Sequence, residues 1–327
     1  MICYQQPKVI VKQYNQQEVL CLDCGELSLA THKDIPEKEV YDKSIQSLVN
    51  YYKFKARLPH NLVVDVMNNI HGIPMTEPTS LAITRRAGNR LEPHYLALEE
   101  DVKNAEIIHG NETSHSVNGV NNWIWVFCNA MLSLFKFKKE RGGDIVEKTL
   151  GKDFKGKLVS DSWATYTSYS RDNKIEQQRC LDHLRRELKY ECKKNHPDIY
   201  KGGCDIYSMV KKGKKYKHKK RRIDIHMKCK AELSMLISYM KGHKNLKKLA
   251  TKIENGRDKW FTYILYPELP MDNKEAERSL RPFVIMRKII GCLRSDIGVK
   301  THEIMMSLIS TWEKQGKNAF YSLQATL

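Results

Sequence analysis

The sequence predicts a mixed α/β fold in which a core sheet is preceded by a helical N-terminal domain and interrupted by a helical insertion. Residues 38–104 carry apolar side chains at helical spacing, whereas short strand-like runs begin at residue 105. A lysine-rich stretch at about 197–260 again reads as mostly helical. With 327 residues, the chain exceeds one small core and suits two or three domains.

The core is predicted from the order of its elements over residues 105–290. Asn118 and Gly119 stand between two strand-like runs and are a strong hairpin signal, so the first strands are expected to be antiparallel. Strands are predicted over 106–109, 123–128, 132–137, 156–160 and 176–180, and helices over 144–150 and 181–192. Three antiparallel strands followed by strand–helix crossovers are typical of a ribonuclease H-like core, an α+β mixed sheet.

The region before the core divides into two predicted parts. Residues 1–37 form a small cysteine-containing segment with short strands. In residues 38–104, helices are expected over 41–54 and 62–70, followed by a longer helix from about residue 81. This order suits a DNA-binding helix-turn-helix, and an ordinary helical domain fits it equally well. After the core, residues 291–327 are expected to be helical.

The composition indicates a polyanionic partner. Lys and Arg outnumber Asp and Glu by 56 to 38, which gives a net charge of +18 and a sequence pI near 9.4. Nucleic acid is the commonest partner of so basic a chain, although a membrane surface or a ribosome would also attract it. The sequence has no apolar run suited to a membrane helix or a signal peptide, and its nine cysteines lack the spacing of a disulfide framework. We therefore expect a cytoplasmic protein with reduced thiols and no membrane partner.

Two carboxylates stand where catalytic residues are often found. Asp161 ends a strand-like run, so it either points into the cleft at the strand's carboxyl end or caps the helix that follows. Glu277 follows an Asp272-x-x-Glu275 capping pattern at the start of a predicted helix, where it could equally be a surface partner of Arg281. Local rules alone leave both alternatives open.

Longer runs carry a more specific signal. One reads VSDSWATY over 159–166, another RCLDHLRR over 179–186, and a third DNKEAERSLRP over 272–282. Together with 107–113, 117–119, 123–127 and the end region up to residue 307, these runs resemble, in the same order, transposases of the insertion sequence 66 family. The resemblance covers nearly the whole chain.

This resemblance implies a cut-and-paste DNA transposase with an Asp-Asp-Glu triad on a ribonuclease H-like fold. Asp161 would be the second acid and Glu277 the third, with the lysine-rich segment inserted between them. Such carboxylates hold two Mg²⁺ or Mn²⁺ ions about 3.5–4 Å apart, which activate a water or a 3′-hydroxyl. It further implies a nucleoid-associated homo-oligomer on the element's terminal repeats and target DNA.

The first acid of the triad is missing. The family pattern at the end of the first core strand is Asp-Glu-Thr, and here it is Asn111-Glu112-Thr113. An Asn side chain at the metal site offers an oxygen without charge, and Glu112 is a poor substitute because adjacent strand residues point to opposite faces. His115 also stands where an aromatic residue is common in the family. We therefore predict impaired or absent strand cleavage.

The N-terminal cysteines suggest an incomplete zinc site. Relatives often carry two Cys-x-x-Cys pairs, whereas Cys21 and Cys24 form a single pair here, with Cys3 upstream. Structural Zn²⁺ needs four ligands, so either Cys3 and a histidine such as His32 complete the set or the site is lost. We expect that it is lost.

Basic residues are the expected DNA contacts. By resemblance, Arg185 and Arg186 are available for phosphates beside Cys180-x-x-His183, a metal-like pair for which we expect a structural or DNA-contacting role. The run 211–222 holds nine Lys or Arg residues in twelve and predicts a phosphate-tracking patch, a solvated loop, or both. The predicted contacts are Arg185, Arg186, Lys219, Lys220, Arg221, Arg222, Arg281, Arg287 and Lys288.

The rival hypothesis is a non-catalytic DNA-binding protein, either a decayed transposase or a competitor for element ends. Asn111 and the shortened cysteine segment favour this reading. A general nuclease on the same fold is a weaker alternative, because the family match continues beyond Glu277.

Overall fold

The chain forms two units in this computed structural model, which describes residues 8–30, 40–142 and 144–327. The first unit extends to Leu91 and includes residues 318–327, and the second extends from Glu92 to Lys317. The division falls inside one long helix, α3 (Glu77–Lys103). The domain boundaries suggested by the sequence stay predictions. Among the described residues, no helix combines the length and the apolarity needed to cross a membrane.

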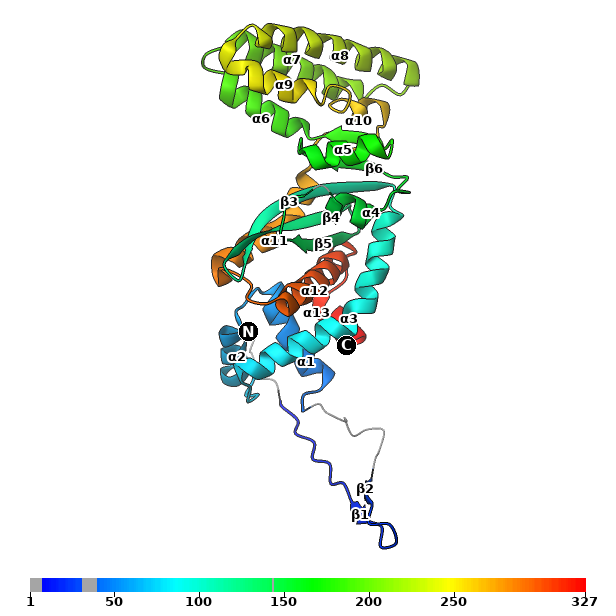
Figure 1. The fold of residues 1–327 in the computed structure, drawn as a ribbon, viewed down its shortest axis with the longest axis vertical. Coiled ribbons are helices and arrows are strands. Elements are labelled where there is room, and N and C mark those ends of the chain that lie inside the picture. Colours follow the sequence, from blue (N-terminus) through cyan, green and yellow to red (C-terminus); the bar gives the residue numbers. More distant parts are fainter. Residues whose placement is uncertain (1–7, 31–39, 143) are drawn as a thin grey trace, which may run out of the picture. The chain divides into compact units, whose positions relative to one another are not determined.

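Helices make up most of the first unit (Figure 1). The Asp42 carboxylate begins α1 by accepting a hydrogen bond from the Ile45 backbone N–H, 3.1 Å away, which satisfies a free donor of the first turn. A hairpin of two exposed strands precedes this helix, with Cys21 and Cys24 in its connection. The elements besides α3 are β1 (Glu18–Leu20), β2 (Leu27–Leu29), α1 (Lys43–Asn50), the π-helical η1 (Tyr51–Lys55), α2 (His60–Asn69) and α13 (Ala319–Thr326).

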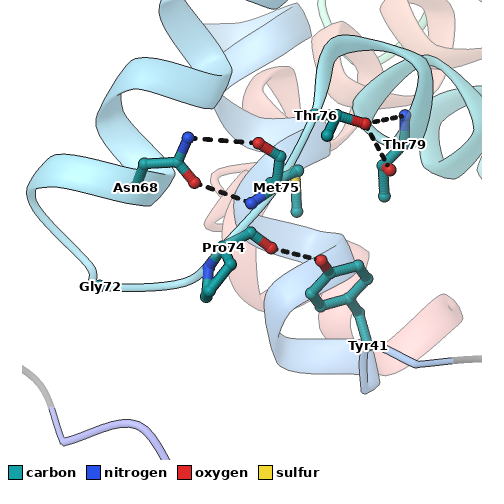
Figure 2. A pocket seen from close by; sticks show the side chains of 7 residues that line it. All are labelled: Tyr41, Asn68, Gly72, Pro74, Met75, Thr76 and Thr79. Atoms are coloured by element: carbon teal, nitrogen blue, oxygen red, sulfur yellow. Dashed lines mark hydrogen bonds between the residues drawn. The ribbon is translucent and has the colours of Figure 1, made fainter.

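The connection between α2 and α3 is held by side chain–backbone hydrogen bonds (Figure 2). The Asn68 amide donates to the Met75 carbonyl at 3.2 Å and accepts the Met75 N–H at 2.7 Å. Gly72 turns the chain at φ 65°, and the Tyr41 hydroxyl donates to the Pro74 carbonyl. These residues line a cavity of about 490 Å³. The two helices and their turn fit either alternative for this region, so the helix-turn-helix stays a prediction.

The second unit contains a mixed five-stranded sheet, which agrees with the predicted α/β class. Its strand order is β5-β4-β3-β6-β7, with β3, β4 and β5 antiparallel and with β6 and β7 parallel to β3. Asn118 (φ 49°) and Gly119 (φ 77°) form the predicted hairpin turn between β3 and β4. The strands are β3 (Ile107–Val117), β4 (Val120–Cys128), β5 (Ser133–Lys138), β6 (Lys157–Ser160) and β7 (Gln177–Arg179).

Helices cover both faces of β3. Its odd-numbered residues face α11 (Lys274–Ile290), because His109 contacts Asn273 and Thr113 contacts Arg287. Its even-numbered residues face α5 (Ala164–Asp172). Gly110 has no room for a side chain there, since a Cβ would lie 2.6 Å from the Tyr166 ring.

The β5 edge of the sheet is closed by α12 (Asp296–Lys314). Three α12 side chains spaced four residues apart accept the N–H groups that β5 turns away from β4. The pairs are Ser133 with Thr311 (3.0 Å), Phe135 with Ser307 (2.9 Å) and Phe137 with Glu303.

The β7 edge is closed in a similar way by the segment before α11. The Arg179 N–H donates to the Lys259 carbonyl at 2.8 Å, and the Gln178 side chain accepts the Tyr263 N–H at 2.8 Å. The Thr262 hydroxyl donates to the Gln177 carbonyl at 2.7 Å. Both outer strands are therefore hydrogen-bonded on their free sides.

The predicted helical segment at about 197–260 packs its helices together (Figure 1) and shares one apolar core with Val159 of β6 and with the helix over 181–192. Leu184, Leu188, Leu233 and Ile237 are among the buried residues that hold its helices together. The helices predicted over 144–150 and 181–192 are confirmed as α4 and α6. The helices not yet given are α4 (Asp144–Leu150), α6 (Leu181–Cys192), α7 (Pro197–Gly213), α8 (Lys219–Lys241), η2 (Lys244–Leu246), α9 (Lys247–Glu254) and α10 (Thr262–Leu265).

Candidate active site

The candidate site lies where the parallel strands β6 and β7 end. Ser160, the last residue of β6, pairs with Gly110 of β3, and its carbonyl accepts the Cys180 N–H at 2.8 Å. Asn111 and Asp161 each follow one member of the Gly110–Ser160 pair, so their backbones are neighbours. This arrangement brings two of the three predicted catalytic positions to the carboxyl end of the sheet, where α/β folds usually bind ligands.

Asn273 holds the start of α11 against this strand end. Its buried amide donates to the Gly110 carbonyl at 2.8 Å, and its Oδ1 lies 3.0 Å from the His109 Nδ1. Its backbone N–H donates to the Cys180 Sγ at 3.4 Å. The N-cap of α11 is thus Asn273, one residue after the predicted Asp272, and its side chain bonds β3 rather than its own helix. The Asp272 carboxylate still accepts the N–H of Lys274, the first residue of the helix, at 3.2 Å.

Glu277 lies one turn further along α11. Its N–H donates to the Asn273 carbonyl at 3.2 Å, which ties its position to the contact with β3. Its carboxylate lies 3.3 Å from the Arg186 Nη2 and 3.5 Å from the His183 Nε2, both from α6. The sequence suggested Arg281 as the partner of Glu277, but α6 supplies the contacts that α11 itself was expected to supply.

Asn111 lies on the face of β3 that α11 covers. Its neighbours on that face, His109 and Thr113, contact Asn273 and Arg287 of α11. The Asn111 side chain is partly buried, and its Oδ1 accepts the Glu112 N–H at 2.9 Å. The strand alternation thus directs position 111 toward the helix that carries Glu277.

Glu112 points to the opposite face, as the alternation predicts. Its fully buried carboxylate accepts hydrogen bonds from the Arg141 guanidinium at 2.6 Å and from the Tyr166 hydroxyl at 2.8 Å. Burial raises the pKa of Glu112, and the nearby Asp161 raises it further, while Arg141 and Tyr166 oppose the shift. The Arg141 guanidinium also lies 3.6 Å from the Trp163 ring centroid. Glu112 therefore belongs to a packed network and not to the α11 side of the sheet.

The Asp161 carboxylate accepts one hydrogen bond from the backbone, and its negative charge acts on the nearby Arg179 guanidinium. Its Oδ1 accepts the Trp163 N–H at 2.9 Å, just before α5 begins. Burial lowers the pKa of the Arg179 guanidinium, and Asp161 counteracts that effect by its charge. The Arg179 Nη2 donates to the Thr167 hydroxyl at 2.7 Å, which fixes this cation near the strand end.

A basic groove on α6 was not predicted. Its cavity of about 560 Å³ is lined by Arg186, Lys189, Tyr190, Lys193 and Lys194. The Tyr190 side chain is 87% exposed, so an aromatic face stands open among four cations. These residues recur every three or four positions and therefore share one helix face. The groove could have been predicted from this spacing, given a helix over 181–194.

The other predicted DNA contacts are found in different settings. Arg185, Arg281, Lys288, Lys219, Lys220 and Arg221 are exposed. The Arg287 guanidinium is instead engaged by β3, where it donates to the Ser114 carbonyl at 2.6 Å. Arg222 donates to the Lys217 carbonyl at 2.9 Å and so closes the turn between α7 and α8. The basic run 211–222 is thus the end of one helix, a turn and the start of another.

The N-terminal cysteines occupy the hairpin connection between β1 and β2. Cys21 and Cys24 are free thiols, and hydrogen bonding from Cys24 lowers the pKa of Cys21. Cys3 and His32, the predicted completing ligands, lie outside the described residues. In the described part of the chain, the one cluster of three candidate metal ligands is Cys180, His183 and Glu277, whose donor atoms lie within 4.8 Å of one another.

Comparison with known proteins identifies the family of this chain. A curated relative, "Uncharacterized protein y4jO" of Sinorhizobium fredii (strain NBRC 101917 / NGR234), is 28% identical over 88 residues. That match spans 27% of this chain and 27% of the relative's length. The sequence model of the transposase IS66 family matches residues 38–301, which cover parts of both compact units and every candidate catalytic position. The chain therefore belongs to the IS66 family of transposases.

Proposed function

We propose that this protein is a DNA transposase that binds the terminal repeats of its mobile element and whose strand-cleavage chemistry is impaired by Asn111. Family membership supports a DNA-processing role in general. The observation that carries the specific proposal is the meeting of β3, β6 and the start of α11, through Gly110, Ser160 and Asn273. Each of the three candidate catalytic residues follows closely after one of these contacts.

The strand order supports a ribonuclease H-like core. Three antiparallel strands form one half of the sheet, and two parallel strands continue it on the other side of β3. We propose that Asn111 on the central strand, Asp161 after β6 and Glu277 on the helix across β3 correspond to an Asp-Asp-Glu triad.

The donor atoms of these residues suit a hard divalent cation, but their total negative charge is too small to hold two such cations. One Asp161 oxygen accepts the Trp163 N–H, which leaves the second oxygen to a cation. One Glu277 oxygen is held by Arg186 and His183. Asn111 adds a neutral amide oxygen. When bound, Mg²⁺ or Mn²⁺ would stabilise developing negative charge and lower the pKa of a bound water. With two carboxylates, the site favours a single tightly held ion.

The basic groove is proposed to bind the DNA strand next to the acids. Arg186 lines the groove and also contacts Glu277, so a phosphate bound by this arginine would lie near the catalytic positions. Tyr190 can stack on an unpaired base, and the surrounding lysines can follow the backbone. Transposition joins paired ends, so we propose that a homo-oligomer acts on DNA.

The Tyr190→Ala variant is expected to bind single-stranded DNA about tenfold more weakly, because stacking on an aromatic contributes roughly 1–3 kcal/mol per base. Fluorescence anisotropy with a labelled oligonucleotide measures the change. Tyr190→Phe keeps the ring and should bind like the parent. Equal losses in both variants, or none in Tyr190→Ala, would contradict stacking in this groove.

The proposed activity is tested on duplex DNA carrying the terminal repeats that flank the gene. In the Asn111→Asp background, Mg²⁺-dependent nicking at the element end is expected, and a further Asp161→Asn or Glu277→Gln change should abolish it. Asp182, a carboxylate on α6 that pairs with Lys274, provides the matched control, and Asp182→Asn should still cleave. Cleavage that survives both Asp161→Asn and Glu277→Gln would refute the assigned triad.

Asn111 also favours a second candidate function, that of a DNA-binding protein without cleavage activity. A chain that binds the repeats without cutting them would act as a competitor for element ends. It would retain terminal-repeat binding by the basic groove and stay inactive even as Asn111→Asp, so the same cleavage assay separates the two.

A further inference from the structure

One cluster of side chains joins Glu277 of the proposed triad to two residues that the triad leaves unexplained. Cys180 follows β7 and is the N-cap of α6, His183 lies in the first turn of α6, and Glu277 comes from α11. The sulfur, imidazole nitrogen and carboxylate oxygen of these residues all lie within 4.8 Å of one another. The start of α6 and the distant helix α11 thus direct three different ligand types to one point.

We propose that Cys180, His183 and Glu277 bind a borderline divalent cation such as Zn²⁺, and that an ion held there withdraws Glu277 from the Mg²⁺ site. A thiolate, an imidazole and a carboxylate are all zinc ligands, whereas Mg²⁺ selects oxygen alone. Three protein ligands leave the fourth tetrahedral position to water or to a bound substrate. The ligand chemistry therefore separates this cluster from the neighbouring oxygen site.

The distances allow such a site to form by a small adjustment. Ligand atoms around tetrahedral zinc lie about 3.5 Å apart, given bond lengths of roughly 2.0–2.3 Å. The Cys180 sulfur is buried and held by the Asn273 N–H at 3.4 Å, so it provides a fixed ligand. Glu277 is partly exposed and moves more easily, and its His183 contact at 3.5 Å already has the spacing of two ligands.

The imidazole of His183 supports the assignment. Its Nε2 faces the Glu277 carboxylate, so this nitrogen is the one placed to bind a cation together with Glu277. Its Nδ1 is shielded from solvent, has no hydrogen-bond partner among the described residues, and would keep the ring proton. A cation bound at Nε2 would offset the charge of the two acidic ligands.

Cobalt provides a direct probe of this site, because Co²⁺ bound to a thiolate has a sulfur-to-metal charge-transfer band. The experiment uses the full chain with Cys21→Ser and Cys24→Ser, which removes the N-terminal pair. Co²⁺ should produce the band in this parent, and Zn²⁺ should displace it. Cys180→Ser should remove the band and weaken Zn²⁺ binding by about 100-fold, of the order seen when a metal site loses a supporting group.

The matched control is Cys192→Ser, which changes another buried cysteine at the end of α6. It should keep the charge-transfer band at full intensity. A band that persists in Cys180→Ser, or that never appears in the parent, would overturn the site. Because His183→Ala leaves the thiol in place, it gives a second reading: the band should weaken and Co²⁺ affinity should fall.

The effect on Glu277 rests on the proposed function and has its own test. In Asn111→Asp, micromolar Zn²⁺ added to excess Mg²⁺ should inhibit cleavage, and Cys180→Ser should raise the inhibitory Zn²⁺ concentration at least tenfold. Equal inhibition of both variants would refute the competition for Glu277. If the cobalt band forms but Asn111→Asp never cleaves, the zinc site stands and the proposed cleavage function fails.

Discussion

Changing Asn111 to Asp is expected to raise Mg²⁺-dependent cleavage of the element end by about 100-fold or more. The substitution replaces a neutral oxygen with a carboxylate on the β3 face that α11 covers. Charge stabilisation by a properly held metal ion contributes several kcal/mol, and each ~1.4 kcal/mol corresponds to a factor of ten in rate. Single-turnover cleavage of a labelled terminal repeat measures the gain.

The Asn111→Glu variant is the control for this prediction, because it tests whether a negative charge that is placed less well is enough. The carboxylate already present at Glu112 cannot take this role, since it lies on the other face of β3 and is bound by Arg141 and Tyr166. We expect less recovery with Glu than with Asp. If the chain already cuts efficiently with Asn111, the predicted impairment is wrong.

The second large effect concerns stability. His115 is 2% exposed, and neither ring nitrogen has a hydrogen-bond partner among the described residues. Burial lowers the pKa of His115 to about 4, and the Arg287 charge adds to the shift. Because each buried unsatisfied group costs roughly 1–3 kcal/mol, His115→Phe is expected to stabilise the fold by an amount of that order. The ring packs beside Phe137, with centroids 5.9 Å apart, where a phenyl group suits the site.

The same substitution should flatten the acid side of the stability curve. A histidine whose folded pKa lies below its unfolded value of 6.5 gives its full contribution above pH 6.5 and loses it as the pH falls toward 4. By pH 5 the loss is about 2 kcal/mol for a pKa near 4. Urea unfolding of parent and His115→Phe at pH 7 and pH 5 measures the difference. His94→Gln changes an exposed histidine and should alter neither curve.

Local signals in the sequence were sufficient for several elements. Asn118 and Gly119 predicted the β3–β4 turn because both residues tolerate the left-handed backbone that the turn requires. The helices predicted over 144–150 and 181–192 are present, and Leu181, Leu184 and Leu188 give the second one an apolar face. The strand β3 extends well beyond the predicted 106–109, because partners on other elements stabilise its polar second half: Arg141 and Tyr166 bind Glu112, and Arg287 binds Ser114.

The candidate site was only partly accessible to sequence reasoning. Asp161 could be located because it follows a strand, but the partners of Glu277 come from α6, where Arg186 lies 91 positions earlier in the chain. Asn273 bonds Gly110 across 163 positions, and a local pattern assigned the cap to Asp272 instead. Such contacts depend on how distant elements pack, which no local spacing encodes.

The closure of both sheet margins limits how copies of this protein can assemble. Since α12 takes up the outward N–H groups of β5 and the 259–263 segment takes up the free side of β7, neither margin offers a template for a strand from a second copy. A synaptic complex would therefore be joined by surfaces other than these two margins, or bridged by the DNA itself. Its stability would then depend on salt concentration and on the presence of both element ends.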